Sequence, residues 1–558
     1  MTPLVPGDAI AMALPGVWIE ITATAIDGAP HDVSLYLDVD AAWTRGDGSG
    51  ALAWQLVTES GASGSTQKRF RVTPAVGTEQ QYVEVNDWPE WGELSLTATV
   101  EDSLSARAGA AGDVRADFAA HGALDGSVSS DFHSAASEPT AFAFAWRSSV
   151  TTPIARRAFL AHGRSSALRV DGVDCLADWT ALGDLGAVSA RALAGADAWR
   201  AKIEAHDDAL LARARTVGGD DYAALIAFAT RQGWGGNLAC TVNGDERIYQ
   251  KEIASGSLTS TVDVIFPTAA LFLVEDPATL GLLLHGFLDH TAHHPYGEAY
   301  PPHDLGPWPL VQGDPTFMDT PVETAGDLLL LAAAHARATG DTRLIQEHRA
   351  LLQSWSDYLI AATVDPPLQS STDDFTGMLP HASVFGMKEA LAVAAWAECL
   401  TLLGDSKAAA STRALASTRF TTWLALVEDS DHLGLTLDGA GWSLKYNLWP
   451  DRLLGLGLVP DDVRGREVAF YRAHQGTYGA PLDSRFSYTK ADWLAWSAAM
   501  ADAQSDFEAL IAPIARMLAR TTSTNAFPDI YDVETMIPPW GFTARPVVGG
   551  VFARLAAP

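Results

Sequence analysis

Apolar and polar residues alternate in short runs over residues 1 to about 150. The clearest runs are Trp18–Ala25, Val33–Val39 and Leu94–Val100. A period of two places successive side chains on opposite faces of a strand, so each run predicts a half-buried β-strand. Asp27-Gly28 stands between the first two runs and predicts a tight hairpin turn there. Several such strands at short spacing predict an antiparallel β-sandwich.

From about residue 186 the apolar positions recur at helical spacing instead. Helical patterns begin at Ala187 and Asp220, and Gly340-Asp341 and Gly404-Asp405 mark a helix end followed by a new start. Further helices are predicted over residues 269–293, 321–339, 342–362, 384–403, 406–428, 461–474, 490–502 and 504–520. Helices of similar length, joined alternately by short turns and long loops, predict helical hairpins that close into a ring.

These patterns predict a multidomain β plus α protein. We expect an N-terminal antiparallel β-sandwich with a connecting segment over residues 1–185 and a barrel of paired helices over residues 186–558. The stretch from about 104 to 138, rich in Gly, Ala and Ser, is expected to add loops to the first domain. In a ring of hairpins the long loops gather at one end, and such loops carry function. A site is therefore expected at the mouth of the barrel.

Composition narrows the class of protein. The 558 residues are 48% hydrophobic and 19% charged, which indicates a globular chain too long for one core. A formal charge of −31 repels phosphate backbones and anionic membrane surfaces, so nucleic acid is not expected as a partner. No uncharged apolar stretch reaches about 18 residues, so no membrane insertion is expected. The N-terminus lacks a signal-peptide pattern. As written the chain is expected to be cytoplasmic, or secreted if it is a fragment or mature form.

The cysteines indicate neither a disulfide framework nor a zinc site. Cys175, Cys240 and Cys399 are far apart and lack any CxxC or Cys/His spacing, so we expect three small buried side chains. No metal and no cofactor are expected. The chain also lacks the nucleophile elbow of serine hydrolases, a phosphate-binding loop, a dinucleotide fingerprint and an HExxH helix. The remaining chemistry is that of carboxylates.

Carboxylates and other polar groups cluster in the loops of the second region. Glu252 and Asp263 lie eleven residues apart beside an apolar, strand-like run that precedes the helix predicted at 269. His303 and Asp304 stand among prolines and aromatic residues, and Glu323 begins a helix. Each also fits a bland interpretation as a solvated charge, a helix cap or a first-turn acid.

A second group of candidates follows along the chain. The acidic pair Asp373-Asp374 precedes Phe375, and like charge with partial burial raises the pKa of such a carboxyl group. A structural turn is the alternative for this pair. His381, Arg485 and Arg545 lie in later segments that mix aromatic residues with hydrogen-bonding groups. That mixture suits a polyhydroxylated or amide-bearing ligand.

At these motifs the chain resembles the glutaminase A family of microbial proteins, whose members combine an N-terminal sandwich with a six-helical-hairpin domain. The resemblance implies an (α/α)6 barrel and, from the family name, hydrolysis of L-glutamine to L-glutamate and ammonia. The matching motifs occur in order at residues 33–38, 251–252, 261–267, 302–306, 321–323, 372–375, 481–485 and 545–550.

The helical domain is also similar to that of β-glucosidases related to non-lysosomal glucosylceramidase. In that family a nucleophilic glutamate precedes a sugar-binding aspartate by eleven residues, as Glu252 precedes Asp263. The resemblance implies that Asp374 is the acid/base, and Asp373 stands where that family has a tyrosine. It further implies that sugar hydroxyls are held by Asp263, His303, Asp304 and Arg545.

Three functional hypotheses follow for a small-molecule substrate. The first is a retaining β-glycosidase in which Glu252 attacks while Asp374 acts as acid and then as base, which requires carboxyl groups about 5–5.5 Å apart. The second is a glutaminase-type amidohydrolase in which Arg485 or Arg545 binds the ends of glutamine. The third is a carbohydrate-binding protein without turnover.

Under either enzymatic hypothesis more side chains are expected to contact the substrate. They are Glu323, Asp373, His381 and Arg485.

Overall fold

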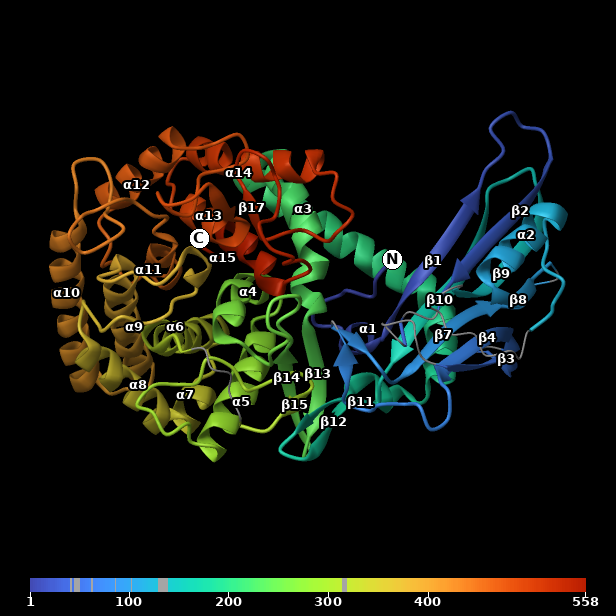
Figure 1. Ribbon diagram of the computed structural model, residues 1–558, viewed down its shortest axis with the longest axis horizontal. Helices are drawn as coiled ribbons and strands as arrows, with labels where there is room; N and C mark the ends of the chain where they lie inside the picture. The colour runs from blue at the N-terminus through green and yellow to red at the C-terminus, as the bar shows by residue number, and fades with distance from the viewer. Residues whose placement is uncertain are drawn as a thin grey trace. The chain divides into compact units, whose positions relative to one another are not determined.

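The computed structural model describes residues 1–40, 43–44, 51–61, 64–85, 87–101, 103–128, 139–313 and 319–557, and of Asp374 only the backbone. The chain forms two compact units (Figure 1). The first comprises Met1–His206 and Ala239–Gly244, and the second comprises Asp207–Leu238 and Asp245–Pro558.

The main layers of the first unit are two antiparallel sheets. One has the strand order β1 (Gly16–Ala23), β10 (Ile154–Gly163), β7 (Glu93–Thr99), β4 (Thr66–Pro74), β3 (Leu52–Ser60). The other has the order β2 (His31–Val39), β9 (Thr140–Val150), β8 (Ser105–Ala110). The strands predicted at residues 18–25, 33–39 and 94–100 are confirmed, with small differences at their ends.

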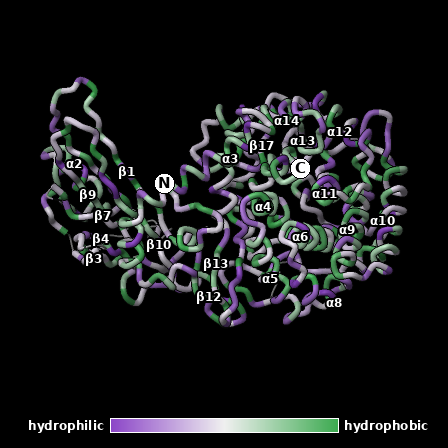
Figure 2. The backbone as a smooth tube through the Cα atoms, turned by 180° about the vertical axis from the view of Figure 1, so that it is seen from behind, coloured by the Kyte–Doolittle hydropathy of each residue, from purple (hydrophilic) through white to green (hydrophobic). Residues whose placement is uncertain are grey.

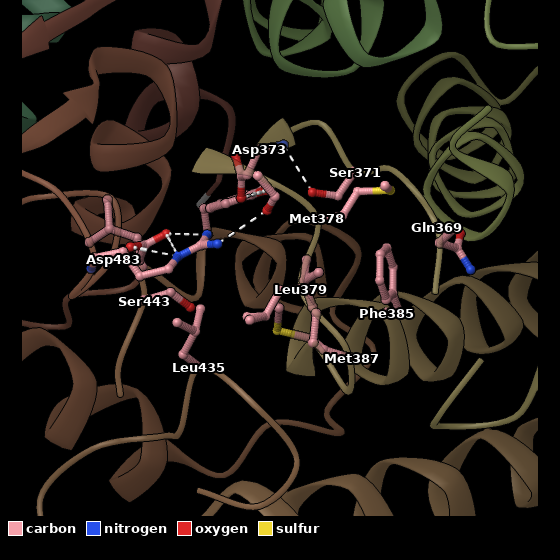
Figure 3. A pocket seen from close by; sticks show the side chains of 16 residues that line it. Gln369, Ser371, Asp373, Met378, Leu379, Phe385, Met387, Leu435, Ser443 and Asp483 are labelled. Atoms are coloured by element: carbon pink, nitrogen blue, oxygen red, sulfur yellow. Dashed lines mark hydrogen bonds and ion pairs between the residues drawn. The ribbon is translucent and has the colours of Figure 1, made fainter. Parts of the chain in front are cut away.

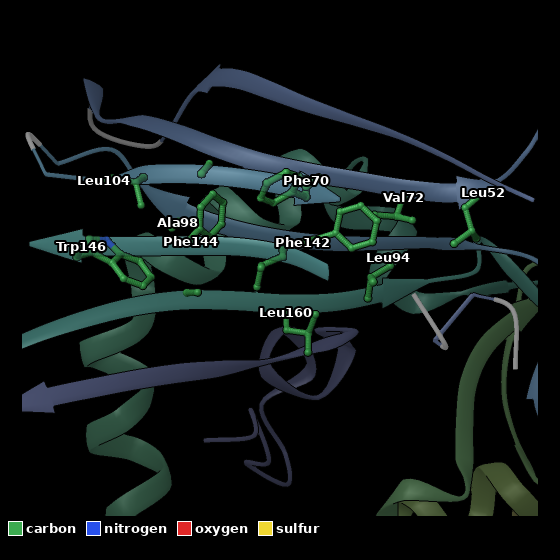
Figure 4. Close-up of a cluster of buried hydrophobic side chains, with 14 residues drawn as sticks. Leu52, Phe70, Val72, Leu94, Ala98, Leu104, Phe142, Phe144, Trp146 and Leu160 are labelled. Carbon is green, nitrogen blue, oxygen red and sulfur yellow. The ribbon is translucent and has the colours of Figure 1, made fainter. Parts of the chain in front are cut away.

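The core of this unit lies between apolar faces of the two sheets (Figure 4). Leu96 on β7 pairs with Leu160 on β10 and with Phe70 on β4, which makes an apolar row across the first sheet. Phe142 and Phe144 project from β9 of the second sheet, and their rings lie 5.6 and 5.1 Å from that of Phe70. Face-to-face burial of large side chains from two sheets defines a β-sandwich, as expected.

The hairpin predicted at Asp27-Gly28 is wrong. β1 pairs with β10 and β2 pairs with β9, so the two consecutive strands belong to different sheets. Gly28 does have the positive φ of a turn residue, at 73°. Alternation shows which face of a strand is buried but does not select the neighbouring strand. The predicted loops at 104–138 are also partly wrong, because β8 and helix α2 (Ala111–His121) lie there.

The prediction that all three cysteines are unpaired is also wrong. Cys175 on β12 (Val173–Ala177) forms a disulfide with Cys240 on β13 (Asn237–Val242), with Cα atoms 5.7 Å apart. β12 and β13 are hydrogen-bonded neighbours, and Ala177 pairs with Cys240. The strand pairing joins residues 65 positions apart, which spacing along the chain does not reveal. Cys399 is buried and unpaired, as expected.

The second unit is helical, and most of the predicted helices are confirmed with changes of a few residues at their ends. The helices predicted over 269–293 and 342–362 are each two helices. It begins within α3 (Leu185–Gly235), which is interrupted at Gly219 with φ 75°. No helix among the described residues is long and apolar enough to cross a membrane. The later helices are α4 (Val262–Glu275), α5 (Pro277–His293), α6 (Pro321–Thr339), α7 (Arg343–Glu347), α8 (Arg349–Ala362), α9 (Ser383–Leu402), α10 (Ser406–Val427), α11 (Trp449–Leu454), α12 (Asp461–Ala473), α13 (Ala491–Ala499), α14 (Gln504–Arg520) and α15 (Ala553–Ala556).

The helices form an inner and an outer layer. α4, α6, α9 and α13 are buried on nearly all sides, whereas α8, α10, α12 and α14 keep an exposed face. A helix that is apolar all round belongs in an interior, and Figure 2 shows α4 largely in the hydrophobic colour. α4 packs on α6, α6 packs on α9, and the 3₁₀ helix η5 (Pro546–Phe552) contacts both α13 and α4. The inner layer therefore closes into the barrel of helical hairpins that was expected.

One local prediction near the barrel mouth is wrong. The pattern of Thr261–Pro267 predicts a strand-like loop, but α4 begins at Val262 and includes Pro267. A short run of β-branched and aromatic residues fits a buried strand and a buried helix equally well, and here helix packing decides. Asp263 therefore lies in the first turn of α4. The single helix predicted over 269–293 is two helices, because Asp276 caps a new one that starts at Pro277.

Candidate active site

Glu252 lies just after β14 (Asp245–Gln250), in the segment that leads to α4. Its side chain is buried and accepts hydrogen bonds from the hydroxyls of Ser255, at Oε1, and Thr261, at Oε2, the latter over 2.8 Å. Nη2 of Arg545 lies 3.9 Å from Oε1. These contacts hold the carboxylate in one orientation beside a positive charge.

His303 stands between two carboxylates. Its Nδ1 lies 3.0 Å from Oδ2 of Asp304, and its Nε2 lies 3.6 Å from Oδ1 of Asp263. Burial alone would lower the pKa of His303, but the two carboxylates outweigh burial and raise it to about 10. Burial likewise opposes ionisation of Asp263, yet His303, Arg545 and Lys490 hold the pKa of Asp263 well below its usual value. Asp304 also accepts a hydrogen bond from the Gly306 amide at 2.7 Å, which fixes this loop.

Arg545 lies just before η5 and contacts Asp529 as well as Glu252. Its Nη1 lies 3.0 Å from Oδ2 of Asp529. Lys490, at the end of β16 (Tyr488–Lys490), lies 3.0 Å from Asp492 and 3.7 Å from Asp529. All these side chains are buried, so each cation is needed to compensate the neighbouring carboxylates.

Glu323 and Asp327 lie one turn apart on α6, and Asp327 contacts α9. Glu323 Oε2 accepts a 2.6 Å hydrogen bond from the Thr372 amide. Burial raises the pKa of Glu323 well above its usual value, although Lys388 opposes the shift. Lys388 on α9 is bonded to Asp327 and lies 3.9 Å from the centre of the Phe266 ring. Burial raises the pKa of Asp327 to about 7 despite this bond.

Asp373 lies in the loop between α8 and α9. The residue keeps some exposed surface, but its carboxyl oxygen Oδ1 is enclosed and has no hydrogen-bond partner among the described residues. The hydroxyl of Tyr446 donates to Oδ2 over 2.9 Å, and the Tyr446 ring stacks on Trp493 at 4.1 Å. Burial raises the pKa of Asp373 to about 7, with the Tyr446 bond opposing the shift. The side chain of Asp374 lies outside the described part of the structure.

A pocket opens beside Asp373. Figure 3 shows side chains from the 369–387 segment and from the loops near residues 435, 443 and 483 around it. Arg485 forks onto Asp483, with Nη2 2.6 Å from Oδ2 and Nε 3.2 Å from Oδ1. Its Nη1 donates to the carbonyl oxygens of Thr376 and Gly377 at 2.9 and 3.1 Å. Arg485 therefore clamps the loop that carries Asp373 and Asp374.

The predicted candidates fall into three groups. In the first group, Glu252 contacts Arg545, and His303 contacts Asp263 and Asp304. The charge of Arg545 helps to lower the pKa of Asp263 and so links the two sets. Glu323 and Asp373 belong to the second group, in which the charge of Asp373 adds to the rise that burial causes in the pKa of Glu323. Glu323 binds the Thr372 amide and Tyr446 binds Asp373, while Arg485 holds the same loop in place.

His381 differs from the other candidates. Its side chain is 65% exposed, and its Nδ1 lies 2.9 Å from Asp365. The described contacts place it with surface charges rather than within the cluster.

Other charged and polar residues of the site were not predicted from the sequence. Asp327 and Lys388 lie inside helices that are otherwise apolar, and a charged residue on an apolar helix face was the available signal. Tyr446 and Lys490 belong to aromatic segments and carried no signal of their own. Asp529 lies in a loop, and only tertiary contact with Arg545 marks it.

Comparison with known proteins places this chain, with its barrel of helical hairpins, among the hydrolases. The family model for the glutaminase A six helical-hairpin domain matches residues 219–555, and a model described as a domain of unknown function, DUF5127, matches residues 1–179. Glutaminase A of Aspergillus oryzae is 30% identical over 573 residues, covering 100% of this chain and 82% of that protein. The chain therefore belongs to the glutaminase A family.

More distant similarities have also been found. A probable glutaminase of Arthroderma benhamiae is 24% identical over 675 residues, covering 100% of this chain and 76% of that protein. A solved glycosidase structure covers 62% of this chain and 96% of its own, with a TM-score of 0.44 and 16% identity. A Streptococcus pneumoniae structure from a family of metal-independent alpha mannosidases, in a non-productive complex with alpha-1,6-mannobiose, covers 63% and 97%, with a TM-score of 0.44 and 14% identity.

Proposed function

We propose that this protein is a retaining glycoside hydrolase. The observation that carries the proposal is the contrast between the environments of two carboxyl groups in the helical unit. Glu252 accepts hydrogen bonds from two hydroxyls and faces Arg545, whereas Oδ1 of Asp373 is enclosed and the pKa of Asp373 is raised to about 7. Carboxyl groups in unlike environments are the usual means by which one supplies a nucleophile and another a proton.

In this mechanism Glu252 attacks the anomeric carbon and forms a covalent glycosyl-enzyme as the bond to the leaving oxygen breaks. Asp374 donates its proton to that oxygen. The resulting carboxylate then accepts a proton from water, the water oxygen bonds to the anomeric carbon, and Glu252 is released. The β-glucosidase resemblance assigns the proton transfer to Asp374. The raised pKa of Asp373 makes that adjacent residue the alternative within the same loop.

The buried cluster around Glu252 supplies groups for the sugar hydroxyls. Nε2 of His303 and Nε of Arg545 are buried donors without a hydrogen-bond partner among the described residues, and Oε1 of Glu323 is such an acceptor. A ligand with hydroxyls on successive carbons offers both donors and acceptors to such atoms. Asp263 and Asp304 orient His303 and provide further acceptors. A small carbohydrate substrate follows from this set.

The proposal is tested on a panel of nitrophenyl α- and β-glycosides with four purified variants. Glu252→Gln and Asp374→Asn are expected to reduce kcat by at least about 10³-fold. Asp373→Asn is expected to lower kcat by a smaller factor. Asp208→Asn, at an exposed position, is the matched control. A full loss in Asp373→Asn with activity in Asp374→Asn would transfer the acid/base role to Asp373.

Azide separates the two catalytic roles. When Glu252 is replaced by Gly, azide attacks the anomeric carbon directly, so the glycosyl azide has the inverted configuration. When the acid/base is removed, azide attacks the glycosyl-enzyme, so an activated substrate gives a glycosyl azide of retained configuration. Absence of glycoside turnover across the panel would contradict the proposal.

A glutaminase is the second candidate, and the 30% identity to Glutaminase A of Aspergillus oryzae favours it. Arg545 then binds the carboxylate of glutamine, because the donors of Arg485 are already bound to Asp483 and the 376–377 backbone. Ammonia release from L-glutamine without glycoside turnover would establish this function. Carbohydrate binding that survives in Glu252→Gln without turnover of either substrate would indicate a binding protein.

A further inference from the structure

Five aromatic side chains from three chain segments gather beside the proposed site. They are Phe375, Phe486, Tyr488, Trp540 and Phe542, here called the aromatic platform. Trp540 is its centre, since its ring lies 5.6 Å from Phe375, 5.3 Å from Tyr488 and 6.0 Å from Phe542. Phe486 stacks on Tyr488 at 5.1 Å with an interplanar angle of 14°. The platform is therefore one continuous set of ring contacts.

The platform is not part of the hydrophobic core. Phe486 is 45% exposed and Trp540 is 36% exposed. Single exposed apolar residues are ordinary, but a contiguous group of aromatic rings in water forgoes the free energy of burial and marks a binding surface. Aromatic rings present flat apolar faces at low conformational cost, which suits a ligand with flat apolar faces of its own.

The platform is continuous with the proposed catalytic groups. Phe375 directly follows Asp374 in the chain. The guanidinium carbon of Arg545 lies 5.1 Å from the centre of the Phe542 ring, and Arg545 in turn faces Glu252. Tyr488 and Lys490 lie two residues apart on β16 and share one face of the strand. The rings thus extend from the charged cluster outward, past the acid/base loop.

The position of the platform beside the acid/base loop is where the leaving group of the substrate would lie. The acid/base protonates the leaving oxygen, so the leaving group must lie on its side of the site. We propose that the aromatic platform binds the leaving group as a second sugar ring, with Trp540 stacked on its C–H face. The inference rests on the proposed function and extends it, because it makes the substrate a disaccharide or longer oligosaccharide.

The test compares two substrates of the same sugar. A glycosyl fluoride has no ring in its leaving group, whereas a disaccharide does. For Trp540→Ala, the ratio of kcat/KM for the disaccharide to that for the fluoride is expected to fall about 10-fold, chiefly through KM. Trp540→Phe is expected to retain most of the ratio, because a stacking face remains. Trp88→Ala is the matched control, since Trp88 on β6 (Trp88–Pro89) of the first unit is 46% exposed.

The outcomes separate this inference from the proposed function. Fluoride turnover by the wild type that is lost in Glu252→Gln supports the glycosidase mechanism whatever Trp540→Ala does. If Trp540→Ala lowers kcat/KM equally for both substrates, or changes it for neither, the proposal of a leaving-group site is overturned. If no glycoside is turned over, calorimetric titration with oligosaccharides decides. Binding that is lost in Trp540→Ala retains the platform as a sugar site, and no binding to the wild type overturns it.

Discussion

Individual buried charges in the barrel depend on specific partners. Lys388 and Asp327 are both almost inaccessible to solvent, and Lys388 supplies the positive charge that faces Asp327. His303 depends in the same way on Asp263 and Asp304. A buried charge whose partner is removed costs several kcal/mol, so each pair predicts a measurable loss.

Replacing Lys388 by Met is expected to lower the free energy of unfolding of the helical unit by about 3–5 kcal/mol, because Asp327 loses its only bonded cation among the described residues. Urea unfolding followed by tryptophan fluorescence measures the change at pH 9, where Asp327, with its pKa of about 7, is ionised in the wild type. Adding Asp327→Leu to Lys388→Met is expected to recover part of the loss, since no charge is then buried. A single variant as stable as the wild type would show that Asp327 accepts a proton at little cost.

The raised pKa of His303 predicts a pH-dependent stability. The folded value is about 10, against 6.5 for the free side chain. The charged imidazole therefore contributes its full stability below about pH 6.5, and that contribution is lost as pH rises toward 10. The free-energy difference between wild type and His303→Gln is expected to shrink by a few kcal/mol across this window. A constant difference in urea unfolding from pH 6 to 10 would contradict the assignment.

At the scale of elements, the loop between α8 and α9 is held by side chains from other parts of the barrel. Arg485 binds the carbonyl oxygens of Thr376 and Gly377, Glu323 binds the Thr372 amide, and Tyr446 binds Asp373. A loop supported in this way keeps its carboxyl groups in place before a ligand arrives. Loss of one support is therefore expected to affect catalysis more than stability.

Arg485→Lys tests this expectation. Lysine keeps the charge but loses the planar fork, so kcat/KM for glycosides is expected to fall about 10–100-fold while the melting temperature changes little. Arg343→Lys is a matched control, because Arg343 also forks onto an aspartate two residues earlier, Asp341, but is 78% exposed. Equal activity of Arg485→Lys and wild type would mean that the loop is positioned without the clamp.

At the scale of the whole molecule, the two compact units are stabilised by different means. The helical unit has extensive inner helices, whereas the sandwich unit adds the Cys175–Cys240 disulfide across 65 residues. A crosslink that closes a long loop restricts the unfolded chain and stabilises the folded one by about 2–4 kcal/mol. The disulfide therefore belongs to the stability of the first unit.

Thiol titration of the denatured protein is expected to detect one cysteine before reduction and three after it. Replacing both Cys175 and Cys240 by Ser is expected to lower the first unit's free energy of unfolding by about 2–4 kcal/mol and to leave glycoside turnover near wild type. Cys399→Ser controls for loss of a buried thiol. Three reactive thiols in the oxidised, denatured protein would show that the bond does not form.

The amino-acid sequence by itself determined most of the strands and helices and their order. A period of two and a period near 3.6 in apolar positions mark strands and helices directly, because each period matches one backbone geometry. The helix over 321–339 is observed with those bounds, and the carboxylates Glu252 and Asp263 stood out by type and spacing. These features depend on residues close together in the chain, so they can be predicted from the sequence.

Only the tertiary structure decided which distant residues meet. Alternation did not show that β1 and β2 join different sheets, and cysteine spacing did not show that β12 and β13 bring Cys175 to Cys240. Most partners of the buried charges could not be predicted either, because they are far away along the chain. A carboxyl group acquires its pKa from burial and from charges that neighbour it in space, as Asp373 does from its enclosed position near Tyr446. Such neighbours exist only after the helices have packed into a barrel.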